Sequence, residues 1–378
     1  MKIAQILNNL RESIILCNRC RCGFCRSRCP TYIASHIESL GARGRNLLAQ
    51  ALLEEYVPLS KTLADRFFTC TMCGYCREVC PLQVDTVKIV QKIRTYLVVE
   101  GFYNSNIREL RENIMNYSNP YGKPIKSKTT WTENIQFYKR GKTLLFGGCV
   151  YSLQDPEVLR ITAQLLLRAG VKLNYLPNEP CCGYPLLCLG FQKEFEDIAK
   201  KNTELLLEAN VEEVVTSCPA CAETLKQYSE YIGKAYFKVL HITEYLKELI
   251  ERGEIQLSHA IPLEVTYHDP CHLTRYLKKY EEPRKIIRSI PGVVLKEKPH
   301  NKLESICCGG GGGILITNPK MALQISDILL QDLLETGVTT VITSCPTCKR
   351  NIETIIKLRK AKMTCMDIVE LVEKAVKI

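Results

Sequence analysis

Four cysteines form one tight run in the first quarter of the chain: Cys70, Cys73, Cys76 and Cys80, with Pro81 after the last. Thiolates at this spacing can place three sulfurs around one cubane 4Fe–4S cluster, while the fourth cysteine, turned away by the proline, serves a second cluster. A zinc site needs only two Cys-x2-Cys pairs and no Cys-Pro step. The run therefore predicts a cubane cluster and electron-transfer chemistry.

A less regular run lies upstream. Its five cysteines are Cys17, Cys20, Cys22, Cys25 and Cys29. The last three align with the last three of the downstream run, but Arg19 occupies the position of the first ligand. Cys17 would supply that ligand through a four-residue loop and Cys20 through a one-residue loop. The wider loop closes with less strain, which favours Cys17 and leaves Cys20 as the alternative.

The two runs are expected to exchange their last ligands. In paired cubane sites the fourth cysteine of each run binds the other cluster. Cys80 is then expected to join the upstream triplet, and Cys29 to join Cys70, Cys73 and Cys76. The 40 residues between Cys29 and Cys70 leave room for helices.

Five cysteines recur twice, in the same order, in the rest of the chain. The first copy is Cys149, Cys181, Cys182, Cys218 and Cys221, and the second is Cys271, Cys307, Cys308, Cys345 and Cys348. A glycine follows the adjacent pair in both copies, at Gly183 and Gly309, and permits close backbone approach. The pair suits two irons held side by side. Both copies are therefore predicted to bind iron–sulfur clusters.

Strand and helix patterns alternate around these cysteines. Residues 142–149, 171–176 and 211–216 predict strands in the first copy, with helices near 156–169 and 191–209. Residues 263–271, 292–297 and 338–343 predict strands in the second copy, with helices near 282–290 and 319–336. This alternation predicts parallel α/β units. The cysteines then fall at strand ends or helix starts, where backbone N–H groups suit anionic clusters.

The repeat indicates an internal duplication. The segments TSCPAC and TSCPTC lie 127 residues apart. We predict an α+β multidomain protein, with a helical ferredoxin-like domain for two 4Fe–4S clusters at 1–103 and a linker at 104–140. Two pseudo-symmetric α/β, Rossmann-like Cys-Cys-Gly lobes are then expected at 141–259 and 260–378.

The composition restricts the cellular setting and the partners. The chain has 378 residues, 21 cysteines and a formal net charge of +11. So many thiols at fixed spacings indicate metal binding in a reducing compartment. The N-terminus lacks the apolar run of a signal peptide, and no stretch is long enough to span a bilayer. We expect a cytoplasmic protein, with association with the inner face of the membrane only through a partner. Clusters bound by thiolates would offset much of the positive charge, so the charge gives little support to nucleic-acid binding.

The repeated Cys-Cys-Gly motifs resemble those of the heterodisulfide reductase catalytic subunits. The order of a ferredoxin domain and two such lobes resembles the D subunit of heterodisulfide reductase, and also the iron–sulfur subunits of glycolate oxidase and anaerobic glycerol-3-phosphate dehydrogenase. The resemblance covers nearly the whole chain. It implies one non-cubane 4Fe–4S cluster at each five-cysteine motif, in addition to two cubane clusters. Both motifs are complete here, which favours the reductase.

Several residues lie beside the cluster motifs. Five consecutive glycines, Gly309 to Gly313, are not followed by the Lys-Ser/Thr of a phosphate-binding loop. They are expected to let backbone amides approach cluster sulfurs. His268 and His272 flank Cys271, and one of them is a candidate proton donor to a leaving thiolate. Cys188, Cys365 and the unused member of the Cys17–Cys20 pair are expected to be structural.

Two functions remain open from the sequence. The first is a heterodisulfide-reductase-like enzyme, in which electrons pass through the cubane clusters to the five-cysteine sites and reduce a disulfide; the second motif, His268 and His272 are its candidate catalytic residues. The alternative is an electron-transfer subunit of a glycolate, lactate or glycerol-3-phosphate flavin dehydrogenase that passes electrons to quinone. The chain has no flavin-binding signature, so either function needs a flavoprotein, cytochrome or quinone-linked partner. A zinc-knuckle nucleic-acid binder is opposed by the Cys-Cys-Gly motifs, and no nucleic-acid partner is expected.

Overall fold

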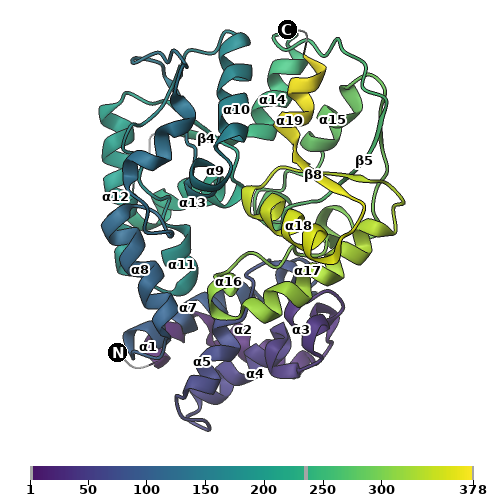
Figure 1. Ribbon diagram of the computed structural model, residues 1–378. Helices are drawn as coiled ribbons and strands as arrows, with labels where there is room; N and C mark the ends of the chain where they lie inside the picture. The colour runs from purple at the N-terminus through teal and green to yellow at the C-terminus, as the bar shows by residue number, and fades with distance from the viewer. Residues whose placement is uncertain (1–2, 234–236, 377–378) are drawn as a thin grey trace.

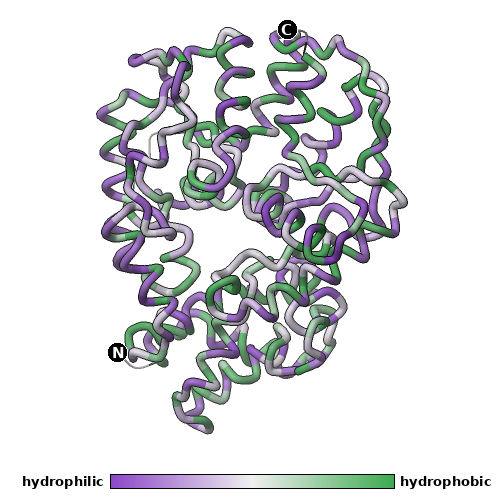
Figure 2. The backbone as a smooth tube through the Cα atoms, viewed as in Figure 1, coloured by the Kyte–Doolittle hydropathy of each residue, from purple (hydrophilic) through white to green (hydrophobic). Residues whose placement is uncertain are grey.

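The computed structural model describes residues 3–233 and 237–376 as a helical N-terminal domain and two α/β lobes (Figure 1). The N-terminal domain lies at the bottom of the view, beneath helices α16 and α17 of the second lobe. Along the helices, hydrophilic and hydrophobic residues alternate (Figure 2), as expected where one face of each helix is buried.

The N-terminal domain consists of short helices around a central long one. Its α-helices are α1 (Ile3–Leu7), α2 (Arg11–Cys20), α3 (Pro30–Ser35), α4 (Ala42–Leu53), α5 (Lys61–Phe68), α6 (Tyr75–Glu78) and α7 (Thr86–Val99). Single 3-10 turns occur at η1 (Asn8–Leu10), η2 (Phe24–Arg26) and η3 (Glu38–Leu40). Helix α7 buries Ile89, Val90, Ile93 and Leu97, whose spacing of one to four residues places them on one face. Asp85 caps its start by accepting a hydrogen bond from the Lys88 N–H.

The segment predicted as a linker, 104–140, contains regular structure. Helix α8 (Ser105–Tyr117) begins at Asn104, whose side chain accepts a hydrogen bond from the Ile107 N–H. A 3-10 stretch, η4 (Ile125–Thr132), follows it. Lys128 and Trp131 of η4 are buried against the first lobe.

Each lobe is built on a four-stranded parallel sheet. The first contains β1 (Thr143–Leu145), α9 (Cys149–Gln154), α10 (Pro156–Arg168), β2 (Leu173–Asn174), α11 (Tyr184–Leu189), α12 (Gln192–Glu208), β3 (Glu213–Thr216), α13 (Pro219–Ile232), β4 (Lys238–His241) and α14 (Ile242–Glu251). The second contains β5 (Leu263–Tyr267), the π-helix η5 (His272–Tyr276), α15 (Glu282–Ser289), β6 (Val293–Leu295), the 3-10 helix η6 (Lys302–Glu304), α16 (Ile314–Thr317), α17 (Pro319–Leu334), β7 (Thr340–Thr343), α18 (Pro346–Arg359), β8 (Thr364–Asp367) and α19 (Ile368–Ala375). The strand orders β2-β1-β3-β4 and β6-β5-β7-β8 are equivalent, which confirms the predicted duplication.

The lobes pack together through equivalent helices. Helix α10 of the first lobe contacts α19 of the second, and α14 contacts α15. Because α10 corresponds to α15 and α14 to α19, the pairing has the self-complementary form of a twofold interface. One apolar core runs through it and includes Leu159, Leu246, Ile286 and Leu371.

The predicted elements agree with those observed. Helices expected near 156–169, 191–209, 282–290 and 319–336 are α10, α12, α15 and α17. The six predicted strands are β1, β2, β3, β5, β6 and β7. Strands β4 and β8, each the last of its sheet, were missed.

Candidate functional site: four groups of cysteine thiols

The two N-terminal cysteine runs line two neighbouring cavities. One cavity is lined by Cys29, Cys70, Cys73 and Cys76, and therefore draws one cysteine from the upstream run. The other is lined by Cys17, Cys20, Cys22, Cys25, Cys76 and Cys80, and draws on the downstream run for the last two. Helix α3 begins directly after Cys29, with Pro30 in its first turn.

Cys17 and Cys20 differ in their surroundings. Cys17 is half-buried on α2, and Asn46 Nδ2 donates a hydrogen bond to its sulfur at 3.1 Å. Burial raises the pKa of Cys17, although the Asn46 hydrogen bond opposes the rise. Cys20 is exposed at the end of the same helix. Both remain within reach of the cavity.

The first five-cysteine motif forms one buried group. Cys149 begins α9, Cys181 and Cys182 precede α11, and Cys218 and Cys221 open α13. The thiols are hydrogen-bonding neighbours in the order Cys149, Cys181, Cys182, Cys221, Cys218. Hydrogen bonds from Cys181 and Cys221 lower the pKa of Cys182 to about 6, despite its burial. The hydrogen bond with Cys181, followed by burial, raises the pKa of Cys149.

The second motif repeats this arrangement. Its thiols are neighbours in the order Cys271, Cys307, Cys308, Cys348, Cys345. The Cys348 thiol donates to the Cys308 sulfur at 3.4 Å. The Gly309 N–H donates to the Cys307 sulfur at 3.4 Å, as the Gly183 N–H does to Cys181 at the same distance.

The glycine of each Cys-Cys-Gly triplet is required by its backbone and by a neighbouring helix. Gly183 has φ +84° and Gly309 has φ +83°, in the left-handed region. A Cβ on Gly183 would lie 2.7 Å from Phe195 of α12, and one on Gly309 would lie 2.6 Å from the Ala322 carbonyl oxygen of α17. The close approach is therefore to the following long helix of each lobe.

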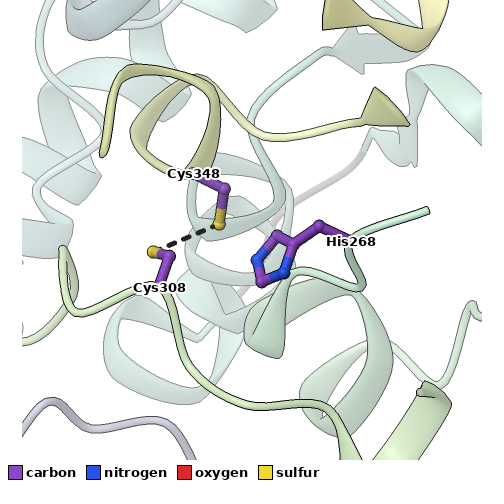
Figure 3. A group of neighbouring side chains, drawn as sticks. All are labelled: His268, Cys308 and Cys348. Atoms are coloured by element: carbon purple, nitrogen blue, oxygen red, sulfur yellow. Dashed lines mark hydrogen bonds between the residues drawn. The ribbon is translucent and has the colours of Figure 1, made fainter. Parts of the chain in front are cut away.

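The two candidate histidines occupy different environments. His268 is 1% exposed, and its ring points toward Cys308 and Cys348 (Figure 3). A ring nitrogen of His268 and the two sulfurs all lie within 4.8 Å of one another. His272 instead lies between the lobes, where its Nε2 is 3.0 Å from the Tyr184 hydroxyl and its Nδ1 is 3.6 Å from Glu223 Oε2.

A ferredoxin-run cysteine contacts the second five-cysteine group. The thiols of Cys73 and Cys307 are hydrogen-bonding neighbours, and both belong to a small buried cluster with Tyr75 and Cys271. The glycine run makes this approach possible. A Cβ on Gly312 would lie 2.5 Å from the Cys70 carbonyl oxygen. The run therefore lies against the backbone of the N-terminal domain, a role that its spacing in the sequence did not indicate.

A buried arginine joins the same three parts of the molecule. Arg94 of α7 is fully buried and donates hydrogen bonds to the carbonyl oxygens of Phe67, Phe68, Cys70, Cys188 and Gly312, at 2.6–3.1 Å. Cys188 belongs to the first lobe and Gly312 to the second. The role of Arg94 was not predicted from the sequence, because one arginine in a helix carries no signal of distant carbonyl partners.

A buried lysine lies beside the first five-cysteine group. Lys128 Nζ donates to Glu179 Oε1 at 3.1 Å and to the Glu179 carbonyl oxygen at 2.7 Å. The Glu179 carboxylate also accepts from the Gly147 and Gly148 N–H groups, next to Cys149. Burial lowers the pKa of Lys128, but Cys149 and Glu179 more than reverse this. In the sequence, the one indication that Lys128 lies in a buried segment is Trp131, the single tryptophan of the chain, three residues after it.

The donor sets suit iron–sulfur clusters. Each five-cysteine group presents five buried thiols in contact, and thiolates are the ligands that such clusters take. Outside the four groups lie Cys188, whose thiol donates to the Pro185 carbonyl oxygen, and Cys365 of β8. The sulfurs therefore fall into two cavities and two five-membered groups. None of the helices within the described residues is long and apolar enough to cross a membrane.

The comparisons with known proteins agree with this organisation. Residues 13–84 match the family described as "4Fe-4S dicluster domain", and residues 143–226 and 265–353 match "Cysteine-rich domain". The chain is 31% identical to the D subunit of the "Dihydromethanophenazine:CoB--CoM heterodisulfide reductase" of Methanosarcina barkeri, over 94% of this chain and 92% of the relative. The corresponding D subunit of Methanosarcina mazei is 30% identical with the same coverage. The "EtfAB:quinone oxidoreductase" of Syntrophomonas wolfei is 26% identical, over 94% of this chain and 57% of the relative. The chain thus belongs to the family of heterodisulfide reductase D subunits and is an iron–sulfur oxidoreductase subunit that transfers electrons.

Proposed function

We propose that this subunit reduces a disulfide or heterodisulfide at its second five-cysteine site. The contact between Cys73 and Cys307 carries the proposal, because it places a ferredoxin-run ligand directly against that site. The first site has no such contact among the described residues. In the reaction the S–S bond breaks, and two electrons and two protons yield two thiols.

The proposed ligand sets follow the four groups. Cys29, Cys70, Cys73 and Cys76 would hold one cubane cluster, and Cys22, Cys25, Cys80 and either Cys17 or Cys20 the other. The two five-cysteine groups would hold one non-cubane 4Fe–4S cluster each. When bound, the clusters would supply the electrons one at a time. His272 is the candidate proton donor to a product thiolate, since it directly follows Cys271 of the second group and lies between the lobes beside Tyr184.

The partner is proposed to be a flavoprotein or a cytochrome or quinone-linked protein that docks at the upstream cysteine run. Cys20 and Cys22 are exposed there, so a partner's redox centre can approach closely. Arg19, Arg21 and Arg43 surround the run, and none forms an ion pair with a described residue. These charges suit an acidic partner surface. We place the chain in the cytoplasm, with contact to the inner face of the membrane made by the partner.

The test begins with iron, acid-labile sulfide and zinc per chain in anaerobically purified protein. The proposal expects about 16 iron atoms, counted as four 4Fe–4S clusters. Oxidation of reduced viologen dye should then depend on an added disulfide and release two thiols for each disulfide consumed. Zinc without iron would refute the cluster assignment.

A matched pair of variants tests which site reacts. Cys308→Ser and Cys182→Ser change equivalent residues in the two groups. Thiol release should be lost in Cys308→Ser and partly retained in Cys182→Ser; the reverse result would overturn the assignment to the second site. Full iron content with dye-to-quinone transfer but no thiol release would favour the alternative, an electron-transfer subunit of a flavin dehydrogenase that oxidises a 2-hydroxy acid or glycerol 3-phosphate.

A further inference from the structure

The two lobes differ at one equivalent position beside their cysteine groups. Phe146 lies three residues before Cys149, and His268 lies three residues before Cys271. The Phe146 N–H donates to the Val215 carbonyl oxygen and the His268 N–H to that of Ile342, both at 2.8 Å. Val215 and Ile342 are the third residues of the equivalent strands β3 and β7. The two side chains therefore start from the same point of the same fold.

The imidazole of His268 is buried. Both ring nitrogens are enclosed, and neither bonds to an oxygen or nitrogen atom of the described residues; the polar neighbour of the ring is the Cys308 thiol. A buried polar group without a full hydrogen-bond partner destabilises the protein. The ring nonetheless points at Cys308 and Cys348 (Figure 3), two sulfurs of the second five-cysteine group. A cluster bound to these thiolates would bring acceptor sulfurs toward the ring.

Neither His272 nor the equivalent residue of the first lobe, Phe146, offers a comparable ring N–H beside its cysteine group. His272 already has Tyr184 and Glu223 as neighbours and stacks on Tyr276, with ring centroids 4.5 Å apart. Phe146, at the equivalent place in the first lobe, has no polar atom and belongs to an apolar core that includes Cys149. A polar ring at this position is thus specific to the second lobe.

We propose that His268 donates a ring N–H hydrogen bond to a sulfur of the cluster held at the second five-cysteine site, and so makes the two sites electronically different. The proposal rests on the proposed function for the presence of clusters. Hydrogen bonds to cluster sulfur raise the reduction potential. The second cluster should therefore accept electrons more readily than the first, where Phe146 provides no such bond. His268 then adjusts the potential of the cluster by direct hydrogen bonding, and the role of proton donor falls to His272.

The first test is the reduction potential of each cluster in anaerobic holoprotein, measured by redox titration with EPR detection. His268→Phe copies the first lobe, and His268→Gln keeps an N–H donor. We expect His268→Phe to lower the potential of one five-cysteine cluster enough to change its reduction equilibrium at least tenfold, about 59 mV for one electron. The potential in His268→Gln should fall between those of His268→Phe and the wild type. The matched change His272→Gln should leave this potential in place.

The second test begins with the wild-type protein. Protein labelled with 15N-histidine should show a nitrogen hyperfine coupling on the signal of one five-cysteine cluster, and His268→Phe should remove it. Full iron content with no coupling in the wild type, or with an unmoved potential in His268→Phe, would overturn this inference alone. Empty five-cysteine sites in the wild type would overturn the proposed function and this inference together.

Discussion

Replacement of Arg94 by methionine should separate the N-terminal domain from both lobes. Methionine keeps the length of the side chain but removes the charge and all of the hydrogen bonds to Phe67, Phe68, Cys70, Cys188 and Gly312. Phe67 and Phe68 end α5, so Arg94 also satisfies carbonyl oxygens at the negative end of a helix. No carboxylate lies within ion-pair distance of Arg94 among the described residues. The carbonyl dipoles, and the anionic cluster expected at Cys70, balance its charge.

The magnitude follows from these contacts. Hydrogen bonds to a charged group contribute roughly 1.5–3 kcal/mol each, but they do not add, because relaxation and water replace some of them. A buried carbonyl oxygen that is left unsatisfied costs about 1–3 kcal/mol, so we expect a total loss of about 3–5 kcal/mol for the five carbonyl groups after relaxation. At about 2–4 °C per kcal/mol, the first unfolding transition should fall by on the order of 10 °C.

The assay is thermal unfolding of anaerobic holoprotein, combined with limited proteolysis of the segments that join the domains. Arg94→Lys keeps the charge but offers three donors from a single nitrogen, so an intermediate loss is expected. The control is Arg111→Met, which removes a half-exposed ion pair with Glu194 that is worth about 1 kcal/mol or less. An Arg94→Met protein that melts with the wild type and resists protease equally well would refute this account of the domain contacts.

Three further changes have definite expected results. Cys17→Ser should reduce the iron content by about four atoms per chain, and Cys20→Ser should leave it unchanged; equal losses, or loss only in Cys20→Ser, would reverse the preference for Cys17. Gly312→Ala should disturb the contact between the domains, because its Cβ would meet the Cys70 carbonyl oxygen at 2.5 Å. The control Gly337→Ala, also at positive φ but with nothing within 4 Å of the added Cβ, should cost only about 1 kcal/mol of stability. Similar unfolding curves and similar rates of dye-to-disulfide electron transfer for the two variants would contradict this. Burial raises the pKa of Asp367 from 3.8 to about 7, so between these pH values the folded state holds a proton that the unfolded state releases. Stability should therefore fall as the pH rises from about 4 to 7. Asp367→Asn should flatten this part of the curve of melting temperature against pH, and parallel curves for the variant and the wild type would show that another group is responsible.

Much of the lobe architecture was predictable because each element carries its own pattern. Helices α10, α12, α15 and α17 are long and amphipathic, and their boundaries agree with the predicted ranges within a few residues. Strands β4 and β8 were missed for a physical reason. Each runs directly into the following helix without a turn, since its last residue, His241 or Asp367, is also the helix cap. The change from strand to helix therefore carries no glycine, proline or loop signal.

The cysteine groups were predictable and their surroundings were not. Residue type and spacing identify a set of thiols, because the ligands of one group lie at fixed intervals in the chain. Lys128 and Glu179 are 51 residues apart, and Arg94 reaches Gly312 across 218 residues. Contacts at that separation depend on how the domains pack, which no local pattern records. The glycine run was recognised as a site of close backbone approach, but the backbone that approaches it belongs to another domain.

The duplicated lobes are equivalent in strand order, in their helix pairing and in the Gly N–H to sulfur contacts of their Cys-Cys-Gly triplets. The N-terminal domain breaks this equivalence, since one cysteine-lined cavity cannot contact both groups in the same way. After its triplet glycine the first lobe continues with Tyr184, whereas the second continues with four more glycines, and the Cys70–Cys73 loop lies against them. The first group instead has Lys128, from the segment that connects the domains. The duplication keeps all ten thiols. One group, however, has the ferredoxin-run contact and an imidazole beside it, and the other has a buried cation, so the two groups have different electrostatic surroundings. Different potentials at the two sites are the expected consequence.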